Sequence, residues 1–514
     1  MELLFSAAQV VFAPGALVAV LAGSLLGVIF GAIPGLTFTV AMALVLPMSF
    51  SLAAAPAIGL LLGTYIGGMT GGSVSAILLG IPGTPSAAAT VLDGYQLTRR
   101  GRAPLALGPA GGASGFGGIV SLLVMVASVD TVARLAMRFG PAETFGLLVF
   151  GLSTICGLAQ KSLLKGLIAG VLGLMVMTIG IDEMEGVVRL TFGTVMLQQG
   201  VSLLVAMIAL FAVPHVIDAF VQHYADDRRD VAFADVRAEL PSLRELGRHF
   251  WLMLRCALLG TGIGAIPGTG GPIAAFLAYA HARKSSPRPD RFGRGEMGGV
   301  VAPETANNAV TGGAMIPLLS LGIPGDPATA ILLSGLLIHG LIPGPMLFIE
   351  HPGEIYQIYL AIIVAYVAVV VIQFFGIRFF VQLLRVPAHL LAVGIIIMCG
   401  YGAFAVRNSV FDVIAVAVLG ALAYGLKRAS IPLTPIILGL VLGPAIEREF
   451  RTALILSDGD PSIFVSSIPG AFFLGLTALV IAGQILGRMR ERRQAMKSAP
   501  SREDSPDAPL TAPE

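Results

Sequence analysis

The chain has 514 residues, of which 56% are hydrophobic and only 12% charged, and its mean hydropathy is +0.87. Soluble proteins carry about 25% charged residues, so this composition excludes an ordinary soluble globular protein. The formal net charge of +2 does not indicate any particular partner, and we expect no nucleic-acid partner.

Long uncharged runs recur along the chain, and they reach or approach the roughly 20 residues that a helix needs to cross a membrane. With their flanking residues, these runs predict an all-α polytopic membrane protein with roughly 10 to 12 spans in the lipid bilayer. The runs are residues 15–46, 166–180, 203–213, 360–375, 413–426 and 464–486.

The first half of the chain contains two Ile-Pro-Gly triplets inside apolar sequence. They are centred on Pro34, within FGAIPGLTFTVAMA, and on Pro82, within MTGGSVSAILLGIPGTPSAAA. Proline removes a backbone hydrogen bond and clashes with the preceding helical turn. Irregular backbone within a bilayer is tolerated only where it is buried in protein or lines an aqueous cavity. The triplets therefore predict broken or re-entrant helices, and the alternative is a simple kink without a ligand.

The second half repeats this arrangement after a polar interruption. Two of its triplets are centred on Pro267, within IGAIPGTGGPIAAF, and on Pro324, within VTGGAMIPLLSLGIPGDPATA, at offsets of 233 and 242 residues from their first-half counterparts. Two more, which begin at Ile342 and Ile468, have no such counterpart and are expected to be turns at the ends of spans. Such an internal duplication is typical of secondary transporters. We expect four regions: a first membrane repeat (1–214), a polar connecting loop (215–249), a second membrane repeat (250–487) and a disordered cytoplasmic tail (488–514).

Basic residues indicate how the two repeats are oriented. Basic loops stay on the cytoplasmic side of a membrane, so equivalent loops of opposite charge pattern belong on opposite sides. The two equivalent loops differ in this way, and we therefore expect two inverted repeats. In the first half the basic residues follow the second triplet, at Arg99, Arg100 and Arg102, whereas in the second half they follow the first triplet, at Arg283, Lys284, Arg288, Arg291 and Arg294.

The four triplets also predict where a ligand binds. A helix that restarts after a break exposes N–H groups that suit an anion, and the carbonyl ends suit a cation such as Na⁺. The neighbouring side chains are small and polar, and such groups can hold a carboxylate without a permanent counter-charge. The predicted substrate-binding residues are Pro34, Gly35, Thr37, Thr70, Gly71, Ser73, Pro82, Gly83, Thr84, Pro267, Gly268, Thr269, Asn307, Asn308, Thr311, Pro324 and Gly325.

Four further residues near the triplets are candidates for the coupling-ion site, namely Thr64, Thr305, Glu304 and Asp326. A carboxylate inside a membrane is costly, which makes Asp326 a functional candidate. The alternative is that Asp326 caps the helix that follows it. Glu304 is expected to bind a coupling ion or a proton, or else to lie at the mouth of the cavity near Glu296. The residues do not distinguish Na⁺ from H⁺.

A passive channel and an intramembrane enzyme are the competing function classes. The sequence contains no GxxxxGK[ST] phosphate loop, no HExxH helix and no His pair at metal-ligand spacing. We therefore expect no enzyme activity and no cofactor other than Na⁺ or H⁺ as coupling ion. The paired triplets with mixed polar side chains argue against a channel.

Three stretches resemble the large permease subunit of tripartite tricarboxylate transporters: GAIPGLTFTVAMALVLPMSF, GTYIGGMTGGSVSAILLGIPGTPSAAATVLDGYQLTRRGRAPLAL and PETANNAVTGGAMIPLLSLGIPGDPATAILLSGLLIHGLIPGP. The resemblance covers roughly residues 14–487. It implies a multi-pass permease of the bacterial inner membrane that works with a small membrane subunit and a periplasmic solute-binding protein. It further implies ion-driven uptake of a dicarboxylate or tricarboxylate, and by analogy alternating access. The regions carried over are 31–39, 64–85, 264–271 and 303–327.

Overall fold

The computed structural model describes residues 2–34, 36–158, 162–182, 184–223, 247–376, 379–380, 382 and 388–498. This part of the chain is almost entirely helical, and eight of its helices are long and apolar enough to cross a membrane. Five shorter apolar helices of 10–17 residues accompany them. The prediction of an all-α polytopic membrane protein is therefore confirmed.

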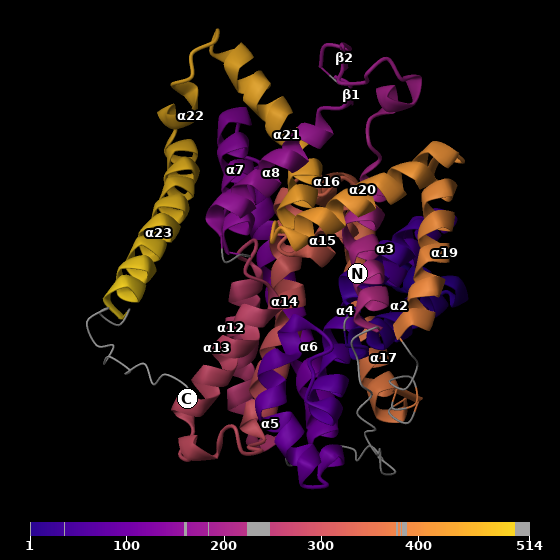
Figure 1. Ribbon diagram of the computed structural model, residues 1–514, viewed down its shortest axis with the longest axis vertical. Helices are drawn as coiled ribbons and strands as arrows, with labels where there is room; N and C mark the ends of the chain where they lie inside the picture. The colour runs from indigo at the N-terminus through magenta and orange to yellow at the C-terminus, as the bar shows by residue number, and fades with distance from the viewer. Residues whose placement is uncertain are drawn as a thin grey trace, which may run out of the picture.

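The helices follow one another with short connections (Figure 1). The first half contains α1 (Glu2–Val11), α2 (Pro14–Ala32), α3 (Phe38–Ser49), α4 (Ala54–Leu79), η1 (Pro85–Ala87), α5 (Ala88–Arg99), α6 (Ala103–Ala136), α7 (Pro141–Leu158), α8 (Leu163–Met177), β1 (Gly180–Ile181), β2 (Val188–Arg189), η2 (Val195–Gln199), α9 (Leu203–Met207), the π-helical η3 (Ile208–Ala212) and α10 (Val213–His223). The second half contains α12 (Phe250–Gly264), α13 (Gly270–Ser285), η4 (Pro289–Arg291), α14 (Gly298–Leu321), α15 (Pro327–Ile338), α16 (Leu347–Glu350), α17 (Pro352–Phe375), α19 (Ala388–Arg407), α20 (Val410–Arg428), α21 (Thr434–Leu456), α22 (Ile463–Ser466) and α23 (Ile468–Ser498).

Two of the predicted regional boundaries fall within helices. Helix α10 continues across residue 214, and α23 remains helical to Ser498, beyond the predicted start of the tail at residue 488. Residues 224–246 and 499–514, which make up most of the predicted loop and tail, lie outside the described residues.

Helices α4 and α14 form the centre of the molecule. Every residue of α4 from Ala57 to Leu78, and every residue of α14 from Gly298 to Ser320, is buried. Both helices carry polar side chains within these stretches, and buried polar groups need partners. Some of them bond to carbonyl oxygens of their own helix, as Thr64 and Thr305 do, and others, such as Tyr65, find partners on neighbouring segments.

Helix α2 packs against α4 through glycines. A Cβ atom on Gly27 would lie 2.3 Å from the Thr64 carbonyl oxygen, and one on Gly63 would lie 2.4 Å from the Val20 carbonyl oxygen. Any larger residue would push the two backbones apart. Small residues at such contacts are the usual way in which membrane helices approach closely.

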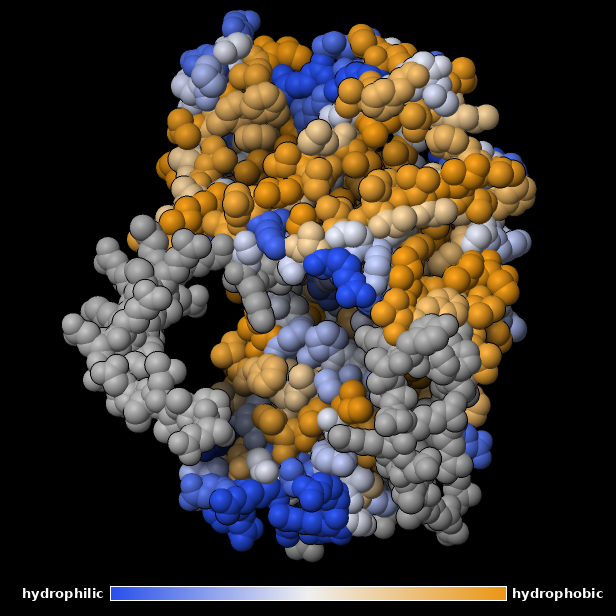
Figure 2. Space-filling view, in the orientation of Figure 1, coloured by the Kyte–Doolittle hydropathy of each residue, from blue (hydrophilic) through white to orange (hydrophobic). Residues whose placement is uncertain are grey.

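The basic connections gather at one end of the molecule. Figure 2 shows hydrophilic residues at the lower end of the drawn face, where α5 and the α13–α14 connection lie in Figure 1. The buried carboxylate of Asp93 in α5 accepts hydrogen bonds from the amides of Gly293 (3.0 Å), Gly295 (2.7 Å) and Glu296 (2.8 Å). The Tyr279 hydroxyl donates a fourth, at 2.9 Å. These bonds hold a first-half helix against the second-half basic loop.

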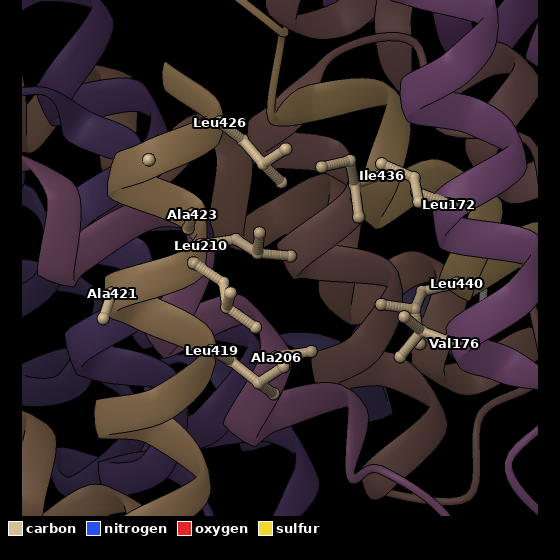
Figure 3. A pocket seen from close by; sticks show the side chains of 12 residues that line it. Leu172, Val176, Ala206, Leu210, Leu419, Ala421, Ala423, Leu426, Ile436 and Leu440 are labelled. Atoms are coloured by element: carbon tan, nitrogen blue, oxygen red, sulfur yellow. The ribbon is translucent and has the colours of Figure 1, made fainter. Parts of the chain in front are cut away.

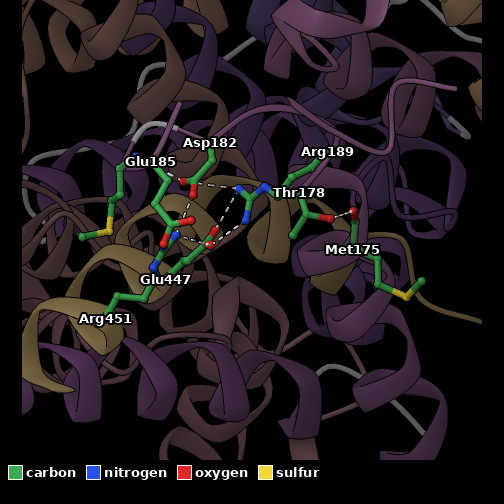
Figure 4. A network of polar contacts seen from close by, with 8 residues as sticks. Met175, Thr178, Asp182, Glu185, Arg189, Glu447 and Arg451 are labelled. Carbon is green, nitrogen blue, oxygen red and sulfur yellow. Dashed lines mark hydrogen bonds and ion pairs between the residues drawn. The ribbon is translucent and has the colours of Figure 1, made fainter. Parts of the chain in front are cut away.

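A charged network at the opposite end fixes the β1–β2 hairpin to α21 (Figure 4). Arg189 Nη1 lies 2.7 Å from Glu447 Oε1, and Arg451 Nη1 lies 2.7 Å from Asp182 Oδ2. The hydrogen bond from Arg451 holds the pKa of Asp182 below its ordinary value. Arg451 also pairs with Glu185. Both arginines of this network, Arg189 and Arg451, are paired with carboxylates, so we interpret it as a structural clamp.

A groove of about 490 Å³ lies among α8, η3, α20 and α21 (Figure 3). Its lining is aliphatic throughout, with Leu172, Leu210, Leu419 and Leu440 pointing into it (Figure 3). A groove without polar side chains cannot satisfy a carboxylate. A site for a charged solute must therefore lie elsewhere.

Candidate functional site

The four paired Ile-Pro-Gly triplets lie in connections between helices. Pro34 separates α2 from α3, Pro82 separates α4 from η1, Pro267 separates α12 from α13, and Pro324 separates α14 from α15. Gly35 lies outside the described residues. The interpretation of these interruptions as broken membrane helices stays a prediction.

Helices α4 and α14 end in the same way before their prolines. Gly80 and Gly322 terminate them in the left-handed conformation, with φ of 69° and 70°. Glycine is the residue that adopts this conformation without strain. These two glycines are 242 residues apart, the same offset as between Pro82 and Pro324.

Within each half, the two interruptions touch each other. The Gly268 amide donates to the Gly325 carbonyl oxygen at 2.8 Å. In the first half, a Cβ atom on Gly83 would lie only 2.1 Å from the carbonyl oxygen of Gly31, near the end of α2. Glycine at these positions therefore allows backbone to approach backbone.

Polar side chains join α4 to α14 where the two central helices meet. The Thr70 hydroxyl donates to Asn308 Oδ1 at 2.8 Å, and Asn307 Nδ2 donates to the Met69 carbonyl oxygen at 3.0 Å. The Tyr366 hydroxyl of α17 donates to the Asn308 carbonyl oxygen at 2.9 Å. These bonds connect the two halves of the chain through neutral groups alone.

One junction between the halves is fully paired, and we call Phe38, Tyr65 and Asp326 the paired junction. The Phe38 and Tyr65 ring centroids are 6.0 Å apart, and the Tyr65 hydroxyl donates to Asp326 Oδ2 at 2.6 Å. Asp326 Oδ1 accepts from the Thr329 amide at 2.8 Å, which caps the N-terminus of α15. All three junction side chains are buried. A carboxyl group of the chain itself therefore already occupies this helix end.

A second junction lacks such pairing, and we call Thr84, Gly271 and Asn307 the unpaired junction. Asn307 Oδ1 and Thr84 Oγ1 are buried and have no hydrogen-bond partner among the described residues. A Cβ atom on Gly271, in the first turn of α13, would lie 2.6 Å from Asn307 Oδ1 and 2.6 Å from Ser86 Oγ. An unsatisfied buried polar atom costs about 1–3 kcal/mol. Asn307 Oδ1 lies beside the start of α13, and Thr84 precedes Ser86 by two residues, so the two unpartnered atoms indicate a place where a ligand completes the bonding.

The two junctions occupy corresponding positions of the two halves. Asn307 follows Tyr65 by 242 residues, and Asp326 follows Thr84 by the same number. Gly271 follows Phe38 by 233 residues. These are the offsets that separate the proline triplets. The paired junction therefore has large or charged side chains where the unpaired junction has small neutral ones.

The helix starts after the interruptions differ in how they are capped. The side chains of Thr37, Thr84 and Thr269, which precede α3, η1 and α13, make no capping bond to the helix that follows. Thr269 instead donates to the carbonyl oxygens of Ile263 (2.5 Å) and Ile266 (2.9 Å). The first N–H groups of a helix have no acceptor within it. The start of α13, beside Asn307, thus offers donors to an anion.

The remaining predicted substrate residues lie around this centre but serve different contacts. Ser73 donates to the Thr70 carbonyl oxygen at 2.7 Å, and Thr311 donates to that of Asn308 at 2.6 Å. The Thr37 hydroxyl pairs with that of Thr39. Gly71 faces α2, because its Cβ would lie 2.5 Å from the Val28 carbonyl oxygen.

The four coupling-ion candidates do not converge. The Thr64 and Thr305 hydroxyls each donate to a carbonyl oxygen of their own helix at 2.8 Å. Asp326 belongs to the paired junction. Glu304 accepts from the hydroxyls of Thr90 (2.5 Å) and Ser114 (3.3 Å). No hydrogen bond joins any two of these four candidates within the part of the chain that the structure describes.

Several residues of the centre are absent from the predicted site. Phe38 and Gly271 are two of them, and setting the two halves side by side at the observed offsets would have paired them. Gln373 of α17 donates to Ser73 Oγ at 3.2 Å while its Oε1 has no partner among the described residues. The sequence signal for these residues was the presence of Tyr366 and Gln373 in the apolar part of α17.

The model of the tripartite tricarboxylate transporter TctA family matches residues 17–438. An uncharacterized 52.8 kDa protein of the TAR-I ttuC′ 3′ region of Agrobacterium vitis is 34% identical over 436 residues, which cover 84% of this chain and 86% of the relative. An uncharacterized protein of the TAR-II ttuC′ 3′ region of the same organism is 34% identical over 234 residues, covering 46% of this chain and 97% of the relative.

Proposed function

Because the chain belongs to the tripartite tricarboxylate transporter TctA family, we propose that it is the permease of a carboxylate uptake system and binds its substrate at the unpaired junction. The observation that carries this proposal is the pair of unpartnered buried atoms, Asn307 Oδ1 and Thr84 Oγ1. Asn307 Oδ1 lies beside the uncapped start of α13. The proposal treats the four interruptions as broken helices of two inverted repeats.

The chemistry of this junction fits a hydroxylated or partly protonated carboxylic acid. The N–H groups at the start of α13 and the hydroxyls of Thr84 and Ser86 donate to carboxylate oxygens. Asn307 Oδ1 can only accept, because its amide nitrogen is committed to the Met69 carbonyl oxygen. It therefore suits a substrate hydroxyl, a protonated carboxyl or a cation. Neutral donors hold the anion without a fixed positive charge that would oppose its release.

The proposal includes partners and an energy source. A periplasmic solute-binding protein delivers the carboxylate, a small membrane subunit completes the complex in the bacterial inner membrane, and a Na⁺ or H⁺ gradient drives symport by alternating access. The family description as tripartite supports the existence of further components. The matched offsets of the two halves support an alternating mechanism, since duplicated halves around a central site are typical of secondary carriers.

Uptake by the reconstituted complex tests this function. The permease and its partner subunits are purified together and placed in proteoliposomes, and uptake of radiolabelled citrate, succinate and malate is measured under imposed Na⁺ and pH gradients. We expect concentrative uptake of at least one probe, which stops when both gradients are collapsed. Uptake that only equilibrates, and that survives the collapse of both gradients, would instead indicate a channel.

Substitutions at the unpaired junction test the site. Asn307→Ala and Thr84→Val each remove one ligand contact, and a hydrogen bond to a charged group is worth about 1.5–3 kcal/mol. We expect uptake at low substrate concentration to fall about tenfold or more. Thr144→Val is the matched control, because the Thr144 hydroxyl in α7 donates to the carbonyl oxygen of Gly140, just before the same helix. Wild-type uptake by both junction variants would place the substrate elsewhere.

A further inference from the structure

Glu304 is a carboxylic acid at the centre of the molecule that no contact described so far explains. It lies in α14, one turn before Asn308, and it is fully buried. Its Oε1 lies 2.5 Å from the Thr90 hydroxyl of α5, and its Oε2 lies 3.3 Å from the Ser114 hydroxyl of α6. Both partners of this carboxyl group are thus hydroxyls, and they come from two different helices.

The other two buried carboxyl groups on the helices around α14 each have a backbone amide among their partners. Asp93 accepts from three backbone amides and from the Tyr279 hydroxyl. Asp326 accepts from the Thr329 amide and from the hydroxyls of Tyr65 and Thr329. An amide N–H can only donate, so it matches an ionised carboxylate, whereas a hydroxyl can both donate and accept. Thr90 and Ser114 can therefore bond to Glu304 in its ionised form and, by a weaker bond, in its protonated form.

We propose that Glu304 carries the coupling proton of this permease; this inference deepens the proposed function and rests on it. In the protonated state the carboxyl O–H donates to the Thr90 oxygen. When the proton leaves to water on the inner side, Thr90 turns its own hydroxyl hydrogen back to the carboxylate. One proton is taken up from water on one side of the membrane and released on the other, and no other bond is made or broken.

The surroundings favour the neutral acid in the present arrangement. An ionised carboxylate in a dry interior needs a cation or several donors, and no basic side chain bonds to Glu304 among the described residues. Two of the packed elements, η1 and α15, carry no titratable group. The titratable and charged groups on the other helices that contact α14 are Tyr65 on α4, Asp93, Tyr95 and Arg99 on α5, Asp130 and Arg134 on α6, Arg255 and Cys256 on α12, Tyr279, His281, Arg283 and Lys284 on α13, and Glu354, Tyr356, Tyr359 and Tyr366 on α17.

The same helix turn connects Glu304 to the substrate junction. Asn308 Nδ2 donates to the Glu304 carbonyl oxygen at 3.1 Å, and Asn307 is three residues after Glu304 on α14. Thr90 belongs to the helical segment that begins just after Thr84. A change of protonation at Glu304 alters the bond between α5 and α14. Helix α14 carries Asn307, and α5 follows η1, which begins directly after Thr84. Proton and substrate binding are coupled through this contact.

The test uses the reconstituted complex and separates coupled from uncoupled transport. Glu304→Gln mimics the protonated acid permanently. We expect accumulation driven by a pH gradient to fall at least tenfold, while exchange of internal unlabelled for external labelled substrate stays within about twofold of wild type. The probe is whichever of citrate, succinate and malate the wild-type complex accumulates. Glu296→Gln, just before α14, is the matched control and should retain both activities.

The outcomes are distinguishable from failure of the proposed function. If the wild-type complex neither accumulates nor exchanges any probe, the proposed function fails. Undiminished pH-driven accumulation by Glu304→Gln overturns the proton proposal, and so does a parallel loss of accumulation and exchange in complex that elutes normally on size exclusion. Thr90→Val provides a second test if Glu304→Gln does not assemble. Losing the hydroxyl donor should move the pH of half-maximal accumulation upward by about one pH unit, and an unchanged pH profile overturns the proposal.

Discussion

The paired and unpaired junctions use corresponding positions of the two halves, yet one is satisfied within the chain and the other is not. At the paired junction, the carboxylate of Asp326 sits at a helix N-terminus and accepts from a backbone amide and from the Tyr65 hydroxyl. At the unpaired junction, threonine replaces the aspartate and asparagine replaces the tyrosine, and both side chains have an unpartnered oxygen. The paired junction therefore shows which chemical group its counterpart lacks, namely a carboxylate beside a helix start.

The most direct way to break this comparison is to supply that carboxylate within the chain. Thr84→Asp places an aspartate at the position that corresponds to Asp326. We expect uptake to fall at least about 100-fold, since an internal anion both occupies the site and repels the substrate. Thermal unfolding in detergent should be unchanged or shifted upward. Thr84→Asn is the control for size, and it should retain more uptake than Thr84→Asp. Equal uptake by both variants would separate Thr84 from the substrate.

The converse change empties the paired junction. Asp326→Ala removes the cap of α15 and leaves the Tyr65 hydroxyl without its acceptor. The expected loss is about 2 kcal/mol in the free energy of unfolding, from a lost N-cap and a lost buried hydrogen bond. Denaturation of purified wild type, Asp326→Ala, Tyr65→Phe and the double variant gives the coupling between the two side chains. Additive effects would show that their hydrogen bond contributes nothing.

A smaller change narrows the unpaired junction without adding charge. Gly271→Ala introduces a Cβ atom 2.6 Å from both Asn307 Oδ1 and Ser86 Oγ, which is closer than normal contact. We expect substrate affinity to fall about tenfold, equivalent to about 1.4 kcal/mol, with little change in folding. The affinity is measured as the concentration for half-maximal uptake. Gly262→Ala is the matched control, because no atom lies within 4 Å of a Cβ at that position.

The sequence predicted the fold class, because hydropathy acts locally, whereas the broken helices and inverted repeats stay predictions. All four predicted triplets lie between helices, and Asn307 and Thr84 were among the predicted substrate residues. The pairing of Tyr65 with Asp326 and of Thr90 with Glu304 could not be predicted, since each joins residues more than 200 positions apart. Sequence spacing says nothing about which long-range partner a buried carboxylate finds. That choice decides which junction is left unpaired.

The smallest predicted effect concerns the charged clamp on the hairpin, where both arginines are paired with carboxylates. Arg451 holds the pKa of Asp182 below its ordinary value, so the clamp stabilises the fold at pH values above the ordinary aspartate pKa of about 4. The stabilisation is lost as the pH falls through the lowered pKa of the folded state. We expect Asp182→Asn to lower the melting temperature slightly at pH 7 and to match wild type once the pH lies below the lowered pKa of Asp182. Salt should shrink the difference at pH 7, because the arginine partner Arg451 is partly exposed and its charge is screened. A difference that persists at low pH would mean that Asp182 acts through packing, and the contrast with the neutral, buried unpaired junction would then no longer be one of charge.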